Sequence, residues 1–315
     1  MLTRRQIRVK VMQALYAYHN GNDQSLREGS QSIKESCHDM FSLYYTTLAL
    51  FKSLWDYAHE QHKIQSTRLK TNRGVNPDDQ RVVDIAPLQL IAKHPFLAKK
   101  IQDNKITLWE IEFEFVRSLY QSLIESLPFQ DLKQIENPSF DHQKKWLVQS
   151  FKEIIAPNDR FYNYIEDLNM QWIDDLPVVN TYLLKQLRKL RANDLSSLNF
   201  PSVEEKKEDI AFGQSLYEKV VANNEFLDDE FKGKTPNWDP DRIALMDRML
   251  IKIAIAELIY FPEIPPKVTL NEYLEIAKEY STPKSNQFIN GVLDKLVKEY
   301  IQNNRMHKKG RGLLE

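Results

Sequence analysis

The stretch TLNEYLEIAKEYSTPKSNQFINGVLDKL, Thr269–Leu296, decides the fold. In it Thr269 is followed three residues later by Glu272, a capping-box spacing in which a hydroxyl and a carboxylate bind unpaired amides at a helix start. Ser281-Thr282-Pro283 offers a second start, because a proline in a first helical turn gives up no hydrogen bond. Apolar residues recur at helical spacing along the stretch. It therefore predicts two consecutive helices joined by a short turn.

A polar, cationic and aromatic cluster lies at the start of the second predicted helix. Its members are Lys284, Ser285, Asn286, Gln287 and Phe288. Phe288 precedes Val292 by four residues and Leu296 by eight, so it shares their apolar face and part of its ring is expected in the core. Gly291 lies inside the same helix, where glycine costs ~1 kcal/mol relative to alanine. Close packing against another helix is the expected reason for it.

The segment Asp241–Phe261 is apolar around nearly its whole circumference. A helix of this kind is expected at the centre of a bundle, covered by its neighbours. Glycine is scarce, at 8 of 315 residues, and no segment has the Val- and Ile-rich, turn-bounded character of strands. These features predict an all-α protein. Further helices are expected at residues 3–18, 40–61, 107–127, 141–155, 177–192 and 203–223.

The N-terminal helix has a basic first half. Thr3 and Gln6 form another capping-box pattern. The basic residues beside them are Arg4, Arg5, Arg8 and Lys10, and residues 1–20 contain no acid. Cations at a helix N-terminus work against the macrodipole, whereas the free amides and guanidinium groups there suit phosphate. The pattern is compatible with phosphate binding and with a solvated basic end that has no partner.

Composition narrows the class of protein. Hydrophobic residues make up 42% of the chain, enough for a packed core, and the net charge of −1 confines any nucleic-acid binding to local patches. Cys37 is the only cysteine, which excludes an internal disulfide, a cysteine-rich zinc site and a CxxC redox pair. No apolar run approaches the ~20 residues of a membrane span, and the basic N-terminus lacks a signal-peptide core. We expect a soluble, cytoplasmic protein.

No catalytic, cofactor or metal site is expected. His59 and His62 share a helix face but lack a visible third ligand, and no GxGxxG, P-loop or nucleophile elbow occurs.

Three blocks of the sequence, in order, resemble the NusB family of transcription antitermination factors. The first is the basic run Arg4–Arg8 with Gln13–Tyr16, the second is Asp247–Val268, and the third is Thr269–Leu296. The resemblance covers roughly residues 1–20 and 208–303. It implies a NusB-like two-lobed helical bundle enlarged by a helical insertion.

The resemblance also implies a division of the chain. Residues 1–20 would form the first family helix, 21–205 the insertion, 206–303 the C-terminal bundle and 304–315 a flexible basic tail. The polar stretch Lys63–Gln80 within the insertion is expected to be a mobile connection. The role of the insertion is left open, as is homodimerisation.

The function implied by the resemblance is RNA binding in antitermination. The residues expected to bind RNA are Arg4, Arg5, Arg8, Lys10, Lys284, Ser285, Asn286, Gln287 and Phe288. Lys284 stands where well-known members carry an acid, which leaves base preference open. The implied partners are the ribosomal protein NusE, contacted through Tyr16 and Asp247, boxA-type RNA of nascent ribosomal transcripts, and the RNA polymerase antitermination complex. No reaction is catalysed.

The sequence leaves two alternatives to an antitermination factor. NusB-like domains also precede RNA cytosine methyltransferase domains, but a lone Cys37 and the lack of a strand, Gly-rich turn and helix argue against that enzyme. A helical protein-interaction scaffold without RNA binding is the other alternative.

Overall fold

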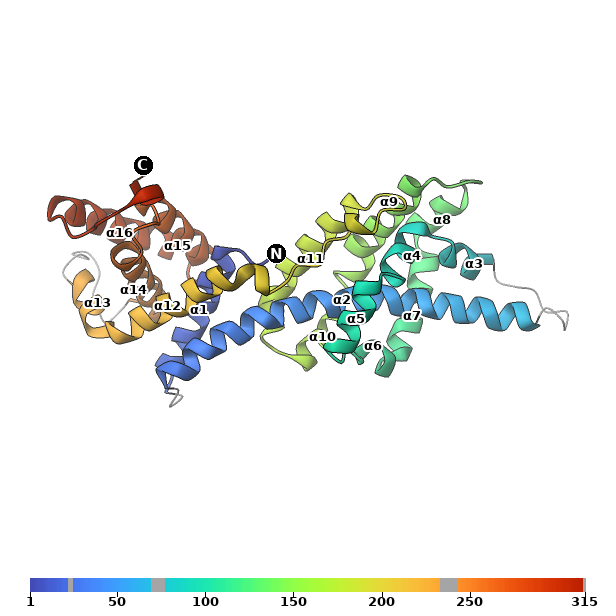
Figure 1. The fold of residues 1–315 in the computed structure, drawn as a ribbon, viewed down its shortest axis with the longest axis horizontal. Helices are drawn as coiled ribbons and strands as arrows, with labels where there is room; N and C mark the ends of the chain where they lie inside the picture. Colours follow the sequence, from blue (N-terminus) through green and yellow to red (C-terminus); the bar gives the residue numbers. More distant parts are fainter. Residues whose placement is uncertain (22–24, 69–76, 233–242, 314–315) are drawn as a thin grey trace. The chain divides into compact units, whose positions relative to one another are not determined.

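The computed structural model describes residues 1–21, 25–68, 77–232 and 243–313 (Figure 1). Every regular element within these ranges is a helix, and an isolated bridge between Arg191 and Asp194 is the nearest approach to a sheet. The expected all-α class is confirmed. The chain divides into two compact units: a central unit, Met1 with His38–Ser202, and a terminal unit, Leu2–Cys37 with Val203–Glu315.

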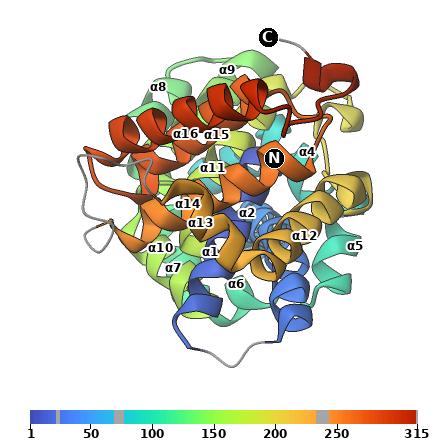
Figure 2. The same ribbon diagram turned by 90° about the vertical axis from the view of Figure 1, so that its left-hand side faces the viewer.

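The terminal unit brings together the two ends of the sequence. It contains α1 (Arg4–His19), the first part of α2 (Leu26–Arg68), η4 (Glu204–Lys206), α12 (Lys207–Ala222), α13 (Asn224–Phe231), α14 (Leu245–Tyr260), α15 (Pro266–Tyr280), α16 (Ser285–Gln302) and η6 (Gly310–Leu313). Figure 2 shows α15 and α16 lying beside each other, and α1 packs against α12, α14 and α15.

Helix α14 is the core of the terminal unit. Its residues from Met249 to Leu258 are buried without interruption, so the helix is covered on all sides. Its neighbours are α1, α12, α13, α15 and α16. This confirms the expected central helix, which begins at Leu245. The expected first turn at residues 241–242 lies outside the described residues.

Helix α15 begins one turn earlier than the Thr269 capping box predicts. Pro266 occupies its first turn, after the extended residue Pro265, because proline lacks the N–H that a first turn leaves unpaired. Thr269 is fully buried inside the helix, and its hydroxyl donates to Glu257 over 2.8 Å. The capping-box prediction at Thr269 was therefore wrong, since a buried carboxylate uses the hydroxyl instead.

The second predicted start lies where expected, with a different arrangement. Helix α15 ends at Tyr280 and α16 begins at Ser285, so Pro283 precedes the helix rather than occupying its first turn. The Ser285 hydroxyl accepts from the Thr282 amide over 3.2 Å. This side chain closes the turn between the two helices.

Gly291 is not at a helix–helix contact. A Cβ placed on it would meet no other atom within 4 Å, and the residue is exposed on α16. The packing explanation for Gly291 was wrong. Gly213 of α12 does allow close packing, because a Cβ there would collide with the side chain of Ile7 on α1.

The central unit is built on the long helix α2. The predicted helix at 40–61 is part of it, and the predicted stripe is buried: Phe41, Tyr44, Tyr45, Leu48, Trp55 and Ala58. The other elements are α3 (Pro77–Val83), α4 (Ala86–Ala92), α5 (Pro95–Asp103), α6 (Leu108–Ile111), α7 (Phe113–Glu125), α8 (Leu127–Lys133), α9 (Phe140–Ser150), the π-helix η2 (Phe151–Ile155), α10 (Asp159–Leu168), α11 (Trp172–Lys189) and η3 (Leu195–Ser197). Residues 69–76 of the expected connection lie outside the described part.

The terminal unit also includes residues that we expected in the insertion. Ile33 and Cys37 are buried, and Ser30 donates to Glu218 of α12 over 2.8 Å. The start of α2 therefore packs with the NusB-like helices.

The C-terminal residues fold back onto the terminal unit. The Lys309 amide donates to the carbonyl of Pro262 over 3.0 Å, and a Cβ at Gly312 would collide with that same carbonyl. Arg305 forms a bidentate pair with Glu230, with N–O distances of 3.0 and 2.7 Å. Backbone and ionic contacts thus hold part of the segment for which the sequence predicts a flexible tail.

Across the described ranges, every helix is too short or too polar to cross a lipid bilayer.

Candidate nucleic-acid interface

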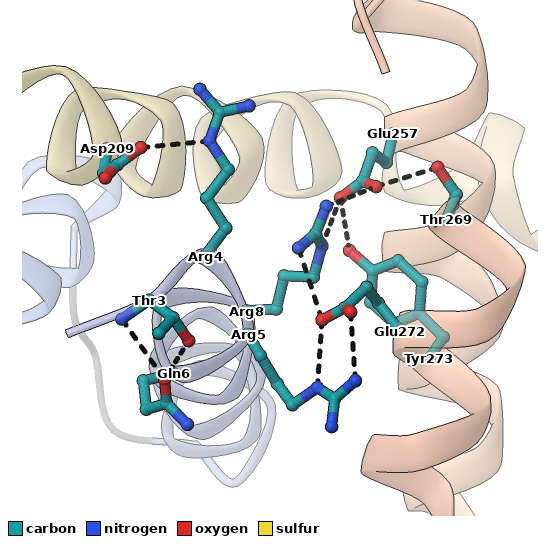
Figure 3. Close-up of polar contacts among 10 residues, drawn as sticks. All are labelled: Thr3, Arg4, Arg5, Gln6, Arg8, Asp209, Glu257, Thr269, Glu272 and Tyr273. Atoms are coloured by element: carbon teal, nitrogen blue, oxygen red, sulfur yellow. Dashed lines mark hydrogen bonds and ion pairs between the residues drawn. The ribbon is translucent and has the colours of Figure 1, made fainter. Parts of the chain in front are cut away.

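The basic end of α1 begins as the sequence predicts. The Thr3 amide donates to Oε1 of Gln6 over 3.2 Å, and the Thr3 hydroxyl contacts the same oxygen (Figure 3). This capping box starts the helix at Arg4 and aligns the arginine side chains that follow.

Arg8 is at the centre of a buried ionic cluster. Its side chain is 2% exposed, and its Nε and Nη2 donate to the two carboxylate oxygens of Glu257 on α14 over 2.7 and 2.8 Å. Glu257 also accepts from the hydroxyls of Thr269 and Tyr273 on α15, over 2.8 and 3.0 Å. Figure 3 shows these side chains converging between the helices. The cluster clamps α1 to both α14 and α15.

The electrostatics of this cluster keep Arg8 charged. Burial lowers the pKa of the Arg8 guanidinium, but the hydrogen bonds and charge of Glu257 outweigh it, so the pKa stands above its ordinary value. Burial raises the pKa of the Tyr273 hydroxyl, which therefore stays protonated and donates to Glu257. Glu272 adds a second carboxylate, 3.7 Å from Nη1 of Arg8.

Two of the expected RNA-binding cations are not on the surface. Arg8 is committed to Glu257, and Lys10 is only 4% exposed. Phosphate could reach either side chain only if α1 left its packing site, which would strand the Glu257 charge in the core. RNA contact by Arg8 and Lys10 therefore stays a prediction, one that the burial of both side chains does not favour.

Arg4 and Arg5 are the accessible cations of the first turn. Arg4 is 48% exposed, pairs with Asp209 of α12 through Nε at 3.0 Å, and lies over the Phe212 ring. Arg5 is 33% exposed and donates from Nε and Nη2 to Glu272, each over 3.0 Å. The hydrogen bond to Glu272 raises the pKa of Arg5. Both side chains lie on one end of α1, as the sequence predicts.

The turn before α16 divides its expected site residues between surface and core. Lys284 and Gln287 are exposed. Ser285 is buried and donates to Asp247 of α14 over 2.8 Å, while Asn286 donates to the carbonyl of Leu274 over 2.9 Å. Ser285 and Asn286 therefore hold the turn in place, and Lys284 and Gln287 face solvent.

Phe288 belongs to the core. Its side chain is only 7% exposed, on the same buried face as Val292 and Leu296. The sequence-based expectation of partial burial is correct, but this ring does not offer a face on which a base could stack.

The two residues expected to contact a protein partner also differ in exposure. Tyr16 of α1 is exposed. Asp247 is buried and accepts from the hydroxyls of Ser281 and Ser285 over 2.5 and 2.8 Å. Asp247 therefore holds the α15–α16 turn against α14, and its contact with a protein partner stays a prediction that this burial does not favour.

Helix α15, which connects to the turn before α16, carries acidic residues near the accessible cations of α1. Glu275 and Glu279 of α15, like Glu272, act electrostatically on Arg5. These carboxylates continue along α15 towards the turn that carries Lys284. The surface thus alternates in sign instead of forming one continuous basic patch.

Sequence reasoning missed the residues that clamp α1. Glu257 is an acid in the otherwise apolar second half of α14, after Lys252, and that isolation was the available signal for a buried ion pair. In the described part of the chain, no three His, Cys, Asp or Glu side chains gather as a metal site.

Comparisons with known proteins identify a family and relatives that this chain resembles. The family model described as NusB family matches residues 170–298. The protein named transcription antitermination protein NusB from Chloroherpeton thalassium is 42% identical over 100 residues, 32% of this chain and 47% of that relative. The protein of the same name from Salinibacter ruber is 41% identical over 103 residues, 33% of this chain and 64% of the relative.

A third relative of that name, from Geotalea uraniireducens, is 38% identical over 97 residues, 31% of this chain and 67% of the relative. The matched segments span about half to two thirds of the lengths of these relatives. No solved structure matches the chain. Because the family model matches residues 170–298 and a named member is 38% identical over two thirds of its own length, the chain belongs to the NusB family.

Proposed function

We propose that this protein is a transcription antitermination factor that binds single-stranded RNA through Arg4 and Arg5 of α1 and through Lys284 and Gln287 at the start of α16. The observation that carries the proposal is the rigid presentation of Arg4 and Arg5. The buried Arg8–Glu257 pair holds their helix in place while both side chains remain accessible. The similarity to proteins named for antitermination supports the same role.

The ion pairs of Arg4 and Arg5 do not prevent phosphate binding. Arg4 contacts Asp209 through Nε, and Figure 3 shows its two terminal nitrogens pointing away from Asp209. The exposed, single-bond Arg4–Asp209 pair contributes ~0–1 kcal/mol, so exchanging its carboxylate for a phosphate costs little. Guanidinium groups bind phosphate through paired N–H donors. The two arginines are therefore suited to exchange protein carboxylates for RNA phosphates.

Lys284 and Gln287 would complete the RNA contact. Lys284 supplies a cation beyond the acidic face of α15, and Gln287 supplies an amide that can read the edge of an unpaired base. Ser285, Asn286 and Phe288 act indirectly, because they hold this turn through buried contacts. Base stacking on Phe288 is not part of the proposal.

The finer identity of the partners follows the family resemblance. We propose that the RNA is a boxA-type element of nascent ribosomal transcripts and that the ribosomal protein NusE is the protein partner, contacted from the exposed Tyr16 side of α1. The complex would travel with RNA polymerase in the cytoplasm. Because both ligands would use α1, each is expected to strengthen binding of the other. The mechanism consists of coupled binding, with no bond made or broken.

Substitution of both accessible arginines tests the proposal. Arg4→Ala with Arg5→Ala should weaken binding of a boxA-type RNA oligonucleotide. It should also reduce the slope of log K against log salt by about 1.4, since each phosphate contact on a single strand contributes about 0.7. Fluorescence anisotropy at several salt concentrations measures both quantities.

The matched control removes two arginines from the central unit. Arg117 and Arg191 are exposed and each pairs with an acid three residues away, so Arg117→Ala with Arg191→Ala makes the same charge change. RNA binding of this control should equal that of the unchanged protein. Equal affinity and equal salt slope in all three proteins would refute RNA binding by α1. Retention of NusE without RNA would then favour the interaction scaffold, for which the paired state of Arg4 and Arg5 is the supporting observation.

A further inference from the structure

A pocket lies at the end of the α15–α16 pair that is opposite Lys284. The first turns of α15, the last turns of α16 and the C-terminal residues 304–313 enclose a pocket of about 850 Å³. The surface belongs entirely to the terminal unit, and none of its lining residues takes part in the RNA contact proposed above.

The pocket has an aliphatic lining. Leu270 of α15, Val297 and Ile301 of α16, and Met306 and Leu313 of the C-terminal segment line it. Ile301 is 63% exposed and Leu313 68% exposed, so the apolar surface extends to the rim. Val268, also exposed, follows the lining residue Lys267 on α15. These aliphatic side chains gather around one concavity, the kind of surface where ligand sites occur most often.

The lining carries cations without acids. Lys267, Lys308 and Lys309 contribute ammonium groups, and no Asp or Glu is among the lining residues. Within the described ranges, Lys267 and Lys309 form no ion pair, whereas many other surface cations of this chain pair with an acid three residues away. Lys308 is partly buried and donates to the carbonyl of Phe261 over 3.1 Å. Burial lowers the pKa of its ammonium group to about 8.

The wall formed by the C-terminal segment is built into the fold. The Lys309 amide and the close approach of Gly312 attach this segment to Pro262, and the Arg305–Glu230 pair anchors its start. The pocket is therefore preorganised before any partner binds, which lowers the entropic cost of association.

We propose that this pocket binds an acidic, aliphatic helix of a partner protein. The leucine-type side chains of such a helix would enter the groove between α15 and α16, and its carboxylates would meet Lys267, Lys308 and Lys309. Helix-in-groove recognition uses apolar anchors at i, i+3, i+4 and i+7, and the aliphatic side chains that line the pocket would receive such anchors. Charge complementarity would orient the helix and exclude basic competitors.

RNA and lipid are poorer occupants of the same surface. The lining includes no Phe, Tyr or Trp and offers the single ring of His307, whereas single-stranded RNA sites hold successive bases on several aromatic rings. A lipid surface is bound by a convex amphipathic face, whereas these aliphatic side chains lie in a concavity walled by the C-terminal segment.

The test uses the full chain and a fluorescein-labelled synthetic amphipathic helix with leucines on one face and glutamates on the other. Fluorescence anisotropy should show saturable binding. Replacing the leucines of the peptide by serine, or its glutamates by lysine, should abolish it. Lys267→Glu with Lys309→Glu should weaken binding by about tenfold or more, because two attractions become repulsions. Ile301→Ser should weaken it without a change of charge.

The control variant is Lys295→Glu with Lys298→Glu. Both residues are exposed on α16 and outside the pocket lining, so the change in net charge is the same. Its affinity for the peptide should match that of the unchanged protein, and circular dichroism checks that all variants fold. Failure of the peptide to bind, or equal weakening by the control, would overturn the proposal.

Two further measurements test RNA and anionic lipid as alternative ligands of the pocket. Loss of RNA-oligonucleotide binding, or loss of binding to vesicles containing anionic phospholipid, in the Lys267→Glu/Lys309→Glu variant with peptide binding unchanged would also overturn it. The Arg4→Ala/Arg5→Ala variant should bind the peptide normally, so this inference can fail or succeed independently of the proposed RNA function.

Discussion

Arg8 is buried, yet it fixes the helix that presents Arg4 and Arg5 to solvent. Its guanidinium neutralises Glu257 in the core, and this pair connects α1 to helices that follow it by more than 200 residues in sequence. Because the buried Arg8 holds α1 in place, Arg4 and Arg5 reach solvent from a fixed position. The basic run at the N-terminus therefore combines a buried structural arginine with two accessible arginines.

Removal of Arg8 is predicted to destabilise the protein strongly. Arg8→Ala leaves Glu257 buried without its counter-charge and should lower the free energy of unfolding by about 3–5 kcal/mol. Arg4→Ala breaks an exposed pair and should cost about 1 kcal/mol or less. Urea denaturation followed by circular dichroism gives both values. Similar losses for the two variants would contradict the structural role of Arg8.

At the scale of helices, two glycines in helix interiors have opposite surroundings. Gly213 allows α12 to approach α1, because any Cβ there meets Ile7. Gly291 on α16 has open space around it and lies on an exposed face. The same substitution at the two positions should therefore change stability in opposite directions.

Alanine at each glycine tests this contrast. Gly291→Ala should raise the free energy of unfolding by about 0.5–1 kcal/mol, since alanine favours the helix and meets no neighbour. Gly213→Ala gains the same propensity, but overpacking against Ile7 costs about 1–3 kcal/mol, so a net loss is expected. Thermal and urea unfolding measure the difference. Stabilisation by Gly213→Ala would show that α1 and α12 are packed less closely than the structure indicates.

On the scale of the whole molecule, the boundary between the two units differs from the one expected from sequence. Residues 25–37 at the start of α2 pack in the terminal unit through Ile33, Cys37 and the Ser30–Glu218 hydrogen bond. The family resemblance did not extend to this segment. Its buried contacts make it part of the NusB-like core of this chain.

Two deletion variants test whether residues 25–37 belong to the terminal unit. Replacing His38–Ser202 by a short Gly/Ser linker should leave a protein that unfolds cooperatively and binds RNA like the full chain. Deleting residues 30–200 in the same way removes Ile33 and Cys37 and should lower the midpoint of thermal unfolding or prevent folding. Calorimetry and RNA anisotropy compare the two proteins. If the shorter deletion also failed to fold, the terminal unit would depend on the central unit for its stability.

Local patterns in the sequence accounted for the helices and for the start of α1. Scarce glycine and the absence of strand-like segments predicted the all-α class, the Thr3–Gln6 spacing predicted where α1 begins, and an all-round apolar profile predicted α14 as the core. These properties depend on neighbours within a few residues, which is why one sequence was enough. The Thr269 prediction was wrong because a buried carboxylate, distant in sequence, uses that hydroxyl.

The sequence by itself determined that this is a helical protein of NusB-like pattern with cations at one helix end and a polar turn at another. Only the tertiary structure decided which of these side chains face solvent. Arg8, Lys10, Asp247, Ser285 and Phe288 became buried, while Arg4, Arg5, Lys284 and Gln287 stayed accessible. The physical reason is that burial of a polar group depends on a partner brought from elsewhere in the chain, and Glu257 lies 249 residues from Arg8.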